Sequence, residues 1–229
     1  MRRFVISDIH GSYNEMMRLF EYVKLNPGVD QLVVVGDMIN RGPDSGPVLK
    51  EIHTLEQSCS NVHVTIGNHE EMMLWYVGEK SDMWTHFGGR QAAESINLAF
   101  RHEGASAIVN WVRQLPLTYE DEAFIYSHAG FQLPYHVEKI NRNYLWQKKK
   151  EFYAIDKKQL LSETDKKCVV HGHTPTTRVT HDGARIAIDL GAQVTTKPKL
   201  ALVELEEELV YVYDFYTKTI KIEQIKKTS

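Results

Sequence analysis

The 229-residue chain has only two cysteines, Cys59 and Cys168, which lie far apart and outside any Cys-x-x-Cys pair. Their scarcity argues against a disulfide framework and against a zinc site built on sulfur. Long apolar runs are also missing: the run in the N-terminal MRRFVISD is too short for a signal peptide, and no stretch approaches membrane-spanning length. We therefore expect a cytoplasmic protein of a reducing compartment, without a membrane partner.

The chain also has no surplus of basic charge and no linker. Its 27 Lys and Arg stand against 30 Asp and Glu, giving a formal net charge of -3, so we expect no nucleic-acid partner. No Gly/Ser-rich or Pro-rich tract and no internal repeat interrupts it, and 42% of its residues are hydrophobic, enough for a proper core. We predict one domain over residues 1–229 and interpret the lysine clusters, such as 148–150, as solvated faces.

The apolar segments predict an α/β fold. Residues 4–6, 32–35 and 61–66 are short apolar runs typical of strands, and the second is rich in β-branched side chains. An amphipathic helix follows the first run and begins at a Ser12–Glu15 capping box, and a second amphipathic helix follows the second run. Strand, helix and strand joined by compact turns form a βαβ unit, which predicts a parallel sheet.

Further elements are predicted along the rest of the chain. The stretch 81–115 has helical character, and 124–126 and 168–170 read as strands. Residues 185–190 are predicted to form another strand. The C-terminal part, 200–225, alternates in polarity as an antiparallel meander does.

Five of the predicted strands stop at polar side chains of the kinds that bind metals. These are Asp8 and His10, then Asp37, then Asn68 and His69, then His128, and last His171 and His173. Each has a plainer explanation when taken alone, as a turn residue, a helix cap or a core histidine. Because the carboxyl ends of the strands are where an α/β sheet binds ligands, five such ends together favour one common site.

The types of side chain point to divalent metal ions. Carboxylate, imidazole and amide oxygen without thiolate suit Mn²⁺, Zn²⁺ or Fe²⁺. Six ligands are too many for one small ion that must keep a water, but they suit two ions sharing one carboxylate, for which Asp37 is the natural choice. Two ions roughly 3.5–4 Å apart clamp the attacking and leaving oxygens of a phosphoryl displacement. We expect two divalent ions, Mn²⁺ foremost, with Fe, Zn or Ni as alternatives.

The same clusters carry a family resemblance. The chain contains SDIHG for the motif GDxHG, GDMINRG for GDxxDRG, GNHE, SHAG and HGHTP, and it also matches in GGR, QLPLTYEDEAFIYSHAG and AIDLGA. In this order the set resembles the phosphoprotein phosphatase branch of the calcineurin-like metallophosphoesterases, and above all the small bacterial and phage serine/threonine protein phosphatases of the bacteriophage lambda type. The resemblance spans almost the whole chain. It implies a four-layer αββα sandwich with mixed sheets.

The resemblance also implies a role for each site residue. The first ion would be held by Asp8, His10 and Asp37, and the second by Asp37, Asn68, His128 and His173. Sequence alone would allow His173 on either ion, and His171 is expected to support the site or the fold without binding metal. Arg41 would clamp the phosphate, because a guanidinium fork matches two phosphate oxygens. His69 would protonate the leaving oxygen.

Two departures from the family pattern concern the site. Asn40 stands where many relatives have an Asp that orients and charges the catalytic histidine. A neutral amide can still orient His69, but it cannot favour the imidazolium form. The stretch ending in Lys148 occupies the place of the family's second phosphate-binding Arg. Lys148 would supply charge to the substrate without a bidentate fork, and its plainer interpretation is a solvated lysine.

These parts imply a mechanism and a substrate class. A hydroxide bridging both ions would attack phosphorus in line without a phosphoenzyme, since bound dications lower the pKa of water to around 7 in favourable sites. We expect a phosphoprotein phosphatase acting on phosphoserine, phosphothreonine or phosphotyrosine, with phosphorylated small molecules as the other substrates.

The alternatives are a symmetrical bis(5'-nucleosyl)-tetraphosphatase, which cleaves diadenosine tetraphosphate, and a metal-containing scaffold without catalysis. Only 45 positions separate His128 from His173, and the resemblance implies a longer insertion there in dinucleotide-cleaving relatives. We therefore expect higher kcat/KM on phosphopeptides than on diadenosine tetraphosphate. The missing Asp at Asn40 and the GPDS after Arg41 favour the tetraphosphatase.

Overall fold

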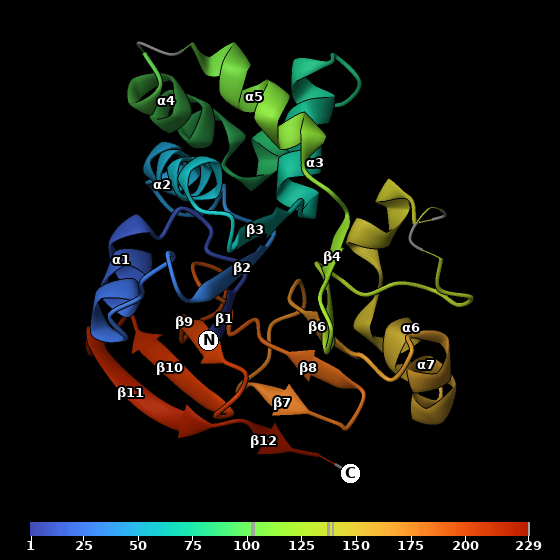
Figure 1. The fold of residues 1–229 in the computed structure, drawn as a ribbon. Coiled ribbons are helices and arrows are strands. Elements are labelled where there is room, and N and C mark those ends of the chain that lie inside the picture. The colour runs from blue at the N-terminus through green and yellow to red at the C-terminus, as the bar shows by residue number, and fades with distance from the viewer. Residues whose placement is uncertain (102–103, 137, 139, 229) are drawn as a thin grey trace.

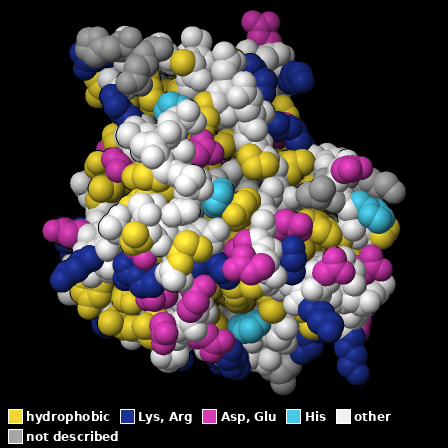
Figure 2. Space-filling model, viewed as in Figure 1, with side chains coloured by type: hydrophobic (Ala, Val, Ile, Leu, Met, Phe, Trp, Pro, Cys, Tyr) yellow, Lys and Arg dark blue, Asp and Glu magenta, His cyan; other side chains and the backbone are white. Residues whose placement is uncertain are grey.

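The computed structural model describes residues 1–101, 104–136, 138 and 140–228, and it has two six-stranded sheets packed face to face with helices outside them (Figure 1). Each sheet mixes parallel and antiparallel pairs. The predicted αββα sandwich is therefore confirmed. Over the face shown in Figure 2, acidic and basic side chains are interspersed, in keeping with the small net charge.

The first sheet contains the predicted βαβ units. Its strand order is β11-β10-β9-β1-β2-β3, and β1, β2 and β3 pair in parallel. The bounds are β1 (Arg3–Ile6), β2 (Gln31–Val35), β3 (Val62–Thr65), β9 (Lys199–Glu204), β10 (Leu209–Asp214) and β11 (Thr219–Gln224). The last three form the antiparallel meander that the alternating C-terminal sequence predicts, and β9 pairs with β1.

The second sheet has the order β12-β7-β8-β6-β5-β4. The bounds are β4 (Thr118–Glu120), β5 (Phe124–Ser127), β6 (Cys168–His171), β7 (Thr180–His181), β8 (Arg185–Ala187) and β12 (Lys226–Lys227). Strands β5, β6 and β8 are parallel, so β5 and β6 end at the same edge. The C-terminal segment passes from β11 in the first sheet to β12 in the second.

Helices cover both outer faces of the sandwich (Figure 1). On the first sheet lie α1 (Tyr13–Tyr22), α2 (Ser45–Ser58), α3 (Asn68–Val77), the 3-10 helix η1 (Met83–Phe87), α4 (Gly89–Ala99) and α5 (Ala105–Gln114). The 3-10 helix η3 (Arg142–Trp146), α6 (Lys149–Ala154) and α7 (Lys157–Glu163) follow β5 in the chain, and α6 and α7 pack on the second sheet. None of the described helices is long and apolar enough to cross a membrane.

The side chains of β1 point alternately into two hydrophobic cores, one on each face of the first sheet. Phe4 and Ile6 join the core beneath the helices of the first sheet, whereas Val5 points into the core between the sheets. A third core, around Phe152 and Leu160, lies under α6 and α7. Burying each such side chain stabilises the fold by roughly 1.5–3 kcal/mol.

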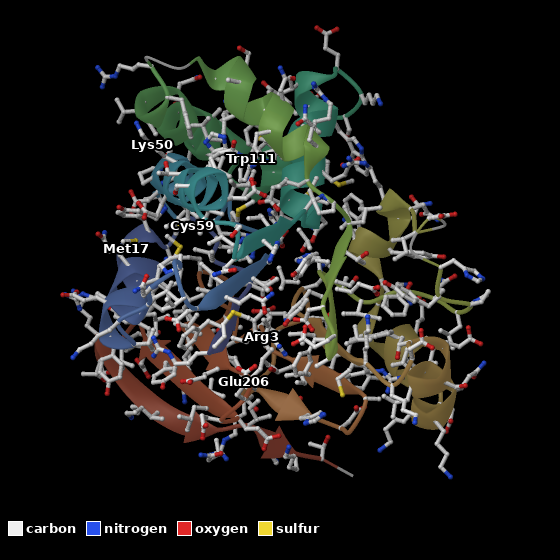
Figure 3. All side chains as sticks on the ribbon, viewed as in Figure 1. Arg3, Met17, Lys50, Cys59, Trp111 and Glu206 are labelled. Atoms are coloured by element: carbon white, nitrogen blue, oxygen red, sulfur yellow. The ribbon has the colours of Figure 1, made fainter. Side chains whose placement is uncertain are left out.

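A buried arginine connects the two sheets. Arg3 in β1 is only 7% exposed, and its guanidinium lies 3.3 Å from Asp121 and 3.5 Å from Glu206. Figure 3 shows Arg3 beside Glu206, whose carboxylate also accepts a 2.8 Å bond from the Arg3 backbone. Asp121 belongs to the turn between β4 and β5, so the ion pair connects β1 of the first sheet to a turn of the second sheet.

Two local predictions differ from the structure. The Ser12 side chain does not cap α1; its hydroxyl instead accepts a 3.2 Å hydrogen bond from Gln193. The strand predicted over 185–190 ends at Ala187, because the Asp189 carboxylate accepts a 2.7 Å bond from the backbone of Gly191 and so fixes a turn. That turn forms part of the candidate site.

Candidate metal centre and active site

The site lies where strands of both sheets end. Asp8 and His10 follow β1, Asp37 follows β2, and Asn68 and His69 begin α3 directly after β3. His128 follows β5 and His173 follows β6, so the second sheet supplies the remaining imidazoles. The fold thus brings the polar strand ends that the sequence singles out to one place, and all of these side chains except His173 are buried.

Asp37 is the centre of the arrangement. Its Oδ2 atom lies 3.4 Å from His128 Nε2, 3.8 Å from His10 Nε2 and 3.9 Å from His69 Nε2. Two groups of potential ligands, each with its atoms within 4.8 Å of one another, share this carboxylate: Asp37 with His10 and His69, and Asp37 with His128 and His173. A shared carboxylate between two such groups is what a bridged pair of ions requires.

Backbone carbonyls orient two of the imidazoles toward Asp37. His10 Nδ1 lies 3.0 Å from the carbonyl of Ile39, and His128 Nδ1 lies 3.1 Å from the carbonyl of Val35. In both rings this leaves Nε2 facing the carboxylate. Metal-binding histidines commonly donate their other ring N–H to a carbonyl, which fixes the tautomer and the direction of the free nitrogen.

Asn68 and Asp8 complete the donor set. The Asn68 amide oxygen is 2.9 Å from His128 Nε2 and 2.9 Å from His173 Nδ1, so these three donor atoms converge on a common point. The Asp8 carboxylate accepts bonds of 3.1 Å from the backbone N–H of His173. Among the described residues, the compact group around His10 contains His69 rather than Asp8. Asp8 instead lies next to the loop that carries His173.

The site contains buried carboxyl groups whose negative charge a bound cation would stabilise. Asp8, Asp37, Glu70 and Asp189 are all buried, and within the described chain none lies within ion-pairing distance of a Lys or Arg. Burial and the charge of Asp189 raise the pKa of Asp8 well above its usual value. Burial also raises the pKa of Asp37, but His128 and His69 overcome this and hold it well below the ordinary range. Oxygen and imidazole donors around unpaired carboxylates fit divalent ions.

Several site residues have a left-handed backbone. Positive φ values occur at Asp8 (51°), His10 (47°), Asp37 (53°), Asn40 (70°), Arg41 (69°) and His173 (66°). This region is uncommon for residues other than glycine, and such strain persists only where the surroundings enforce it. The strand-end loops therefore need strong anchors.

Glu70 is the main anchor, and our sequence analysis did not assign it a role. Its buried carboxylate accepts bonds from the backbone N–H groups of Asp37 (2.8 Å), Met38 (2.8 Å), Ile39 (3.2 Å) and Gly67 (2.9 Å). Burial and then the charge of Asp37 raise its pKa to about 7. The signal in the sequence is an acid in the first turn of a helix that starts right after a strand.

Two glycines permit the strand ends to approach so closely. A Cβ on Gly67 would lie 2.3 Å from the Asp37 carboxylate, and a Cβ on Gly172 would lie 2.0 Å from the Asp8 carboxylate. Both glycines belong to the GNHE and HGHTP motifs. They are required because a side chain would occupy the space of a proposed metal ligand.

His69 and Arg41 lie at the mouth of the site. His69 packs edge-on against His10 and Phe87, and its buried Nδ1 has no hydrogen-bond partner among the described residues. Burial lowers the pKa of His69 to about 4, although Asp37 opposes this. The exposed Arg41 guanidinium lies 4.8 Å over the Phe87 ring, which holds it in place without removing its hydrogen-bonding capacity.

These side chains line a cleft of about 250 Å³. Its walls are His10, Asp37, Arg41, Asn68, His69, Met72, Met83, Phe87, Trp146, His173, Pro175, Asp189 and Val194. The lining includes the candidate metal ligands and also apolar side chains. Among the apolar ones is Trp146, which stacks on Trp75 with ring centroids 4.9 Å apart.

Asn40 makes different contacts from those expected. Its amide oxygen accepts a 2.7 Å bond from Trp84 Nε1, and its amide nitrogen donates a 3.1 Å bond to the carbonyl of Phe87. Both polar atoms of the fully buried side chain are therefore engaged with η1. Asn40 thus positions Phe87, which contacts both Arg41 and His69.

We expect Asn40→Asp to destabilise the protein by about 1–3 kcal/mol, because it replaces a donor with an acceptor against the Phe87 carbonyl. Chemical denaturation of the variant and the wild type measures this difference. The matched control is Asp44→Asn, where the side chain makes no capping bond. An unchanged midpoint for Asn40→Asp would contradict the observed contacts.

Lys148 and Lys149 differ in their surroundings, and neither of them lines the cleft. The Lys148 side chain is 79% exposed, pairs at 3.8 Å with Glu151 and does not line the cleft. Lys149 is half-buried and lies 5.2 Å over the ring of Tyr153, so it is not a solvated lysine. Burial lowers the pKa of the Lys149 ammonium, and the nearby charge of Asp189 opposes this. The expected role of Lys148 at the substrate therefore receives no geometric support.

His171 lies behind the site. It is buried, and its Nε2 is 3.0 Å from the hydroxyl of Tyr153. Burial lowers its pKa to about 3, so the ring is neutral. This placement agrees with the expected supporting role.

Residues 1–206 match the calcineurin-like phosphoesterase family. The chain belongs to this family. The predicted family is thereby confirmed, and the expectation of two divalent ions is in keeping with it and with the two groups around Asp37. The identity of the ions is a matter for proposal.

Curated relatives of this phosphoesterase are named symmetrical bis(5'-nucleosyl)-tetraphosphatase. The protein from Erwinia tasmaniensis is 32% identical over 133 residues, which cover 57% of this chain and 44% of that protein. The one from Cronobacter sakazakii is 30% identical, with 57% and 43% covered. The chain therefore spans less than half the length of these relatives.

Solved structures share the fold at lower identity. A cold-active protein tyrosine phosphatase superposes with a TM-score of 0.67 and 19% identity, covering 98% of this chain and 79% of that one. A putative diadenosine tetraphosphatase gives a TM-score of 0.63 with 20% identity, covering 98% and 93%. At this level of identity, the two superpositions show the shared fold alone.

Proposed function

We propose that this phosphoesterase hydrolyses the phosphoanhydride chain of symmetrical dinucleoside tetraphosphates, with two divalent ions, Mn²⁺ foremost, held around Asp37. The observation that carries the proposal is the cleft, in which a guanidinium stacked on an aromatic ring, Arg41 on Phe87, stands beside the metal-binding groups. The apolar wall beyond it suits a nucleoside. The names of the curated relatives favour this reading over a phosphoprotein phosphatase.

The residues divide the work in a definite way. The ions, when bound, would polarise phosphoryl oxygens and lower the pKa of a coordinated water. Asp37 would hold both ions, Asn68, His128 and His173 would hold the second, and His10 and Asp8 would hold the first. Arg41 would bind two phosphate oxygens as a fork. His69 would give a proton to the leaving oxygen, and a phosphate dianion beside it would raise its low pKa.

A second candidate is hydrolysis of phosphate monoesters on protein side chains. The short segment between His128 and His173 favours it, because little chain is available to cover the cleft. Met83 and Val194 at the rim are each 43% exposed, so the mouth offers apolar surface to a protein substrate. This was the expectation from sequence, and it stays the alternative.

A substrate panel distinguishes the two candidates. The Mn²⁺-loaded protein is assayed on diadenosine tetraphosphate, a phosphoserine peptide and p-nitrophenyl phosphate. Higher kcat/KM on the dinucleotide, with ADP as the sole product, supports our proposal, and the reverse ranking supports the phosphatase. Stoichiometric metal without turnover of any of the three would indicate a scaffold protein.

Two adjacent lysines provide a matched test of the cleft. We expect Lys149→Ala to lower kcat/KM about 10-fold, which corresponds to roughly 1.4 kcal/mol, because the half-buried Lys149 offsets the negative charge of Asp189, a residue that lines the cleft. Lys148→Ala removes the same charge from an exposed position and should change kcat/KM less than 2-fold, as a median surface charge does. Steady-state kinetics on one substrate decides it, and equal effects would refute the assignment.

A further inference from the structure

A second cavity, of about 330 Å³, adjoins the metal cleft and has no part in the chemistry described so far. It is lined by Pro175, Thr176, Thr177, Leu190, Thr195, Thr196, Lys197 and Lys199. Pro175 borders both spaces. The volume is in the range of small-molecule sites, roughly 300–1,000 Å³.

A turn held by hydrogen bonds lies between the two spaces. Val194 lines the metal cleft and its neighbour Thr195 lines the second cavity, so one turn separates them. Asp189 fixes this turn through a 2.7 Å bond from Gly191, and its carbonyl accepts a 2.9 Å bond from Thr176 in the neighbouring loop. The two spaces therefore meet at Pro175, next to a turn that hydrogen bonds hold in place.

The lining of the second cavity suits an anion attached to an apolar or hydroxylated group. Lys197 is exposed and Lys199 half-buried, and within the described chain neither forms an ion pair with an acidic residue. Asp214 lies opposite Lys199 across the β9–β10 pair, and its carboxylate accepts two 3.0 Å backbone bonds. These bonds contribute more than the charge of Lys199 to the lowered pKa of Asp214. Leu190 supplies apolar surface, and no acidic side chain lines the cavity.

We propose that this cavity binds the far nucleoside phosphate of a substrate whose scissile phosphate lies at the metal cleft, with Lys197 and Lys199 holding its phosphate oxygens. The inference rests on the proposed function, since a dinucleoside tetraphosphate has two charged, nucleoside-bearing ends. One end would occupy the Phe87 and Trp146 side of the metal cleft. The other would extend past Pro175 into the second cavity. The enzyme would then prefer substrates that are long enough to occupy both spaces.

The test uses the double variant Lys197→Ala/Lys199→Ala with Mn²⁺. Its control, Lys158→Ala/Lys166→Ala, removes the same charge from exposed positions in and after α7. We expect the ratio of kcat/KM for diadenosine tetraphosphate to that for p-nitrophenyl phosphate to fall about 10-fold in the first variant only, as lost charge-assisted contacts imply. Lys197→Arg/Lys199→Arg should restore the ratio, and thermal melts confirm that each variant is folded.

A second readout needs no turnover of the dinucleotide. ATP and orthophosphate are compared as inhibitors of p-nitrophenyl phosphate hydrolysis. The inhibition constant of ATP should rise about 10-fold in the Lys197→Ala/Lys199→Ala variant, while that of orthophosphate, which fills only the metal cleft, stays within 2-fold. If the wild type does not cleave diadenosine tetraphosphate, the proposed function fails. An unchanged inhibition constant for ATP overturns the second cavity as a subsite in either case.

Discussion

Asp37→Asn is expected to lose both metal ions and at least about 10³-fold in kcat/KM. Its carboxylate is the one group common to both ligand clusters, with imidazole nitrogens 3.4–3.9 Å away. An amide keeps the shape but removes the charge that a bridging ligand supplies. Because Lewis-acid stabilisation is worth several kcal/mol and 1.36 kcal/mol is a factor of ten, the loss should be of this order.

Metal content and activity are measured on the same purified sample. Elemental analysis after loading with Mn²⁺ should give about two ions per chain for the wild type and fewer than one for Asp37→Asn. Asp44→Asn, a half-buried Asp seven positions further along the chain, is the control and should match the wild type. Full occupancy in Asp37→Asn would show that this carboxylate does not bridge the ions.

His69→Asn is expected to keep the metal and to slow hydrolysis in a way that depends on the leaving group. A general acid contributes about 10²–10⁴-fold where the leaving oxygen is basic, as in a phosphoserine peptide. A p-nitrophenolate or ADP leaving group needs less protonation, so the loss there should be at most about 10-fold. The imidazole is suited to this task, because it borders the cleft and its Nδ1 has no hydrogen-bond partner among the residues that the structure describes.

The comparison of leaving groups separates the acid from a ligand. His69 Nε2 lies 3.9 Å from Asp37, so the geometry also admits His69 as a metal ligand in the group with His10. A ligand role predicts loss of metal and an equal loss on all substrates. Retained metal with unequal losses supports the acid, and metal-free His69→Asn protein would refute it.

The strand ends could be predicted from sequence because their signal is local. Asp37, Asn68 and His128 each come just after an apolar strand. Such polar side chains are costly to bury unless they have a binding partner. Parallel pairing of β1, β2 and β3 then brings three of these ends together. The layers follow from alternation along each strand. The fold and the candidate metal ligands could therefore be predicted from the sequence alone.

The contacts that hold the candidate site in place could not be predicted from the sequence, because they depend on where long side chains point. The position of Glu70 in the first turn of α3 indicates a capping role toward Gly67, but nothing in GNHE indicates the three further bonds from the backbone of the loop after β2. Asn40 is next to Arg41, the proposed phosphate-binding residue, yet its amide bonds to Trp84 and Phe87. Lys148 and Lys149 are equivalent in sequence, and only the start of α6 decides which one packs on Tyr153.

The division of the donors between the two sheets has a consequence for folding. The first sheet brings Asp8, His10, Asp37 and Asn68, and the second brings His128 and His173, so the group of Asp37 with His128 and His173 needs both sheets. A bound pair of ions would act as a cross-link between the two halves of the sandwich. Affinity for metal and resistance to unfolding would then be one linked quantity, with about 2.7 kcal/mol of added stability at a free metal concentration 100 times the Kd.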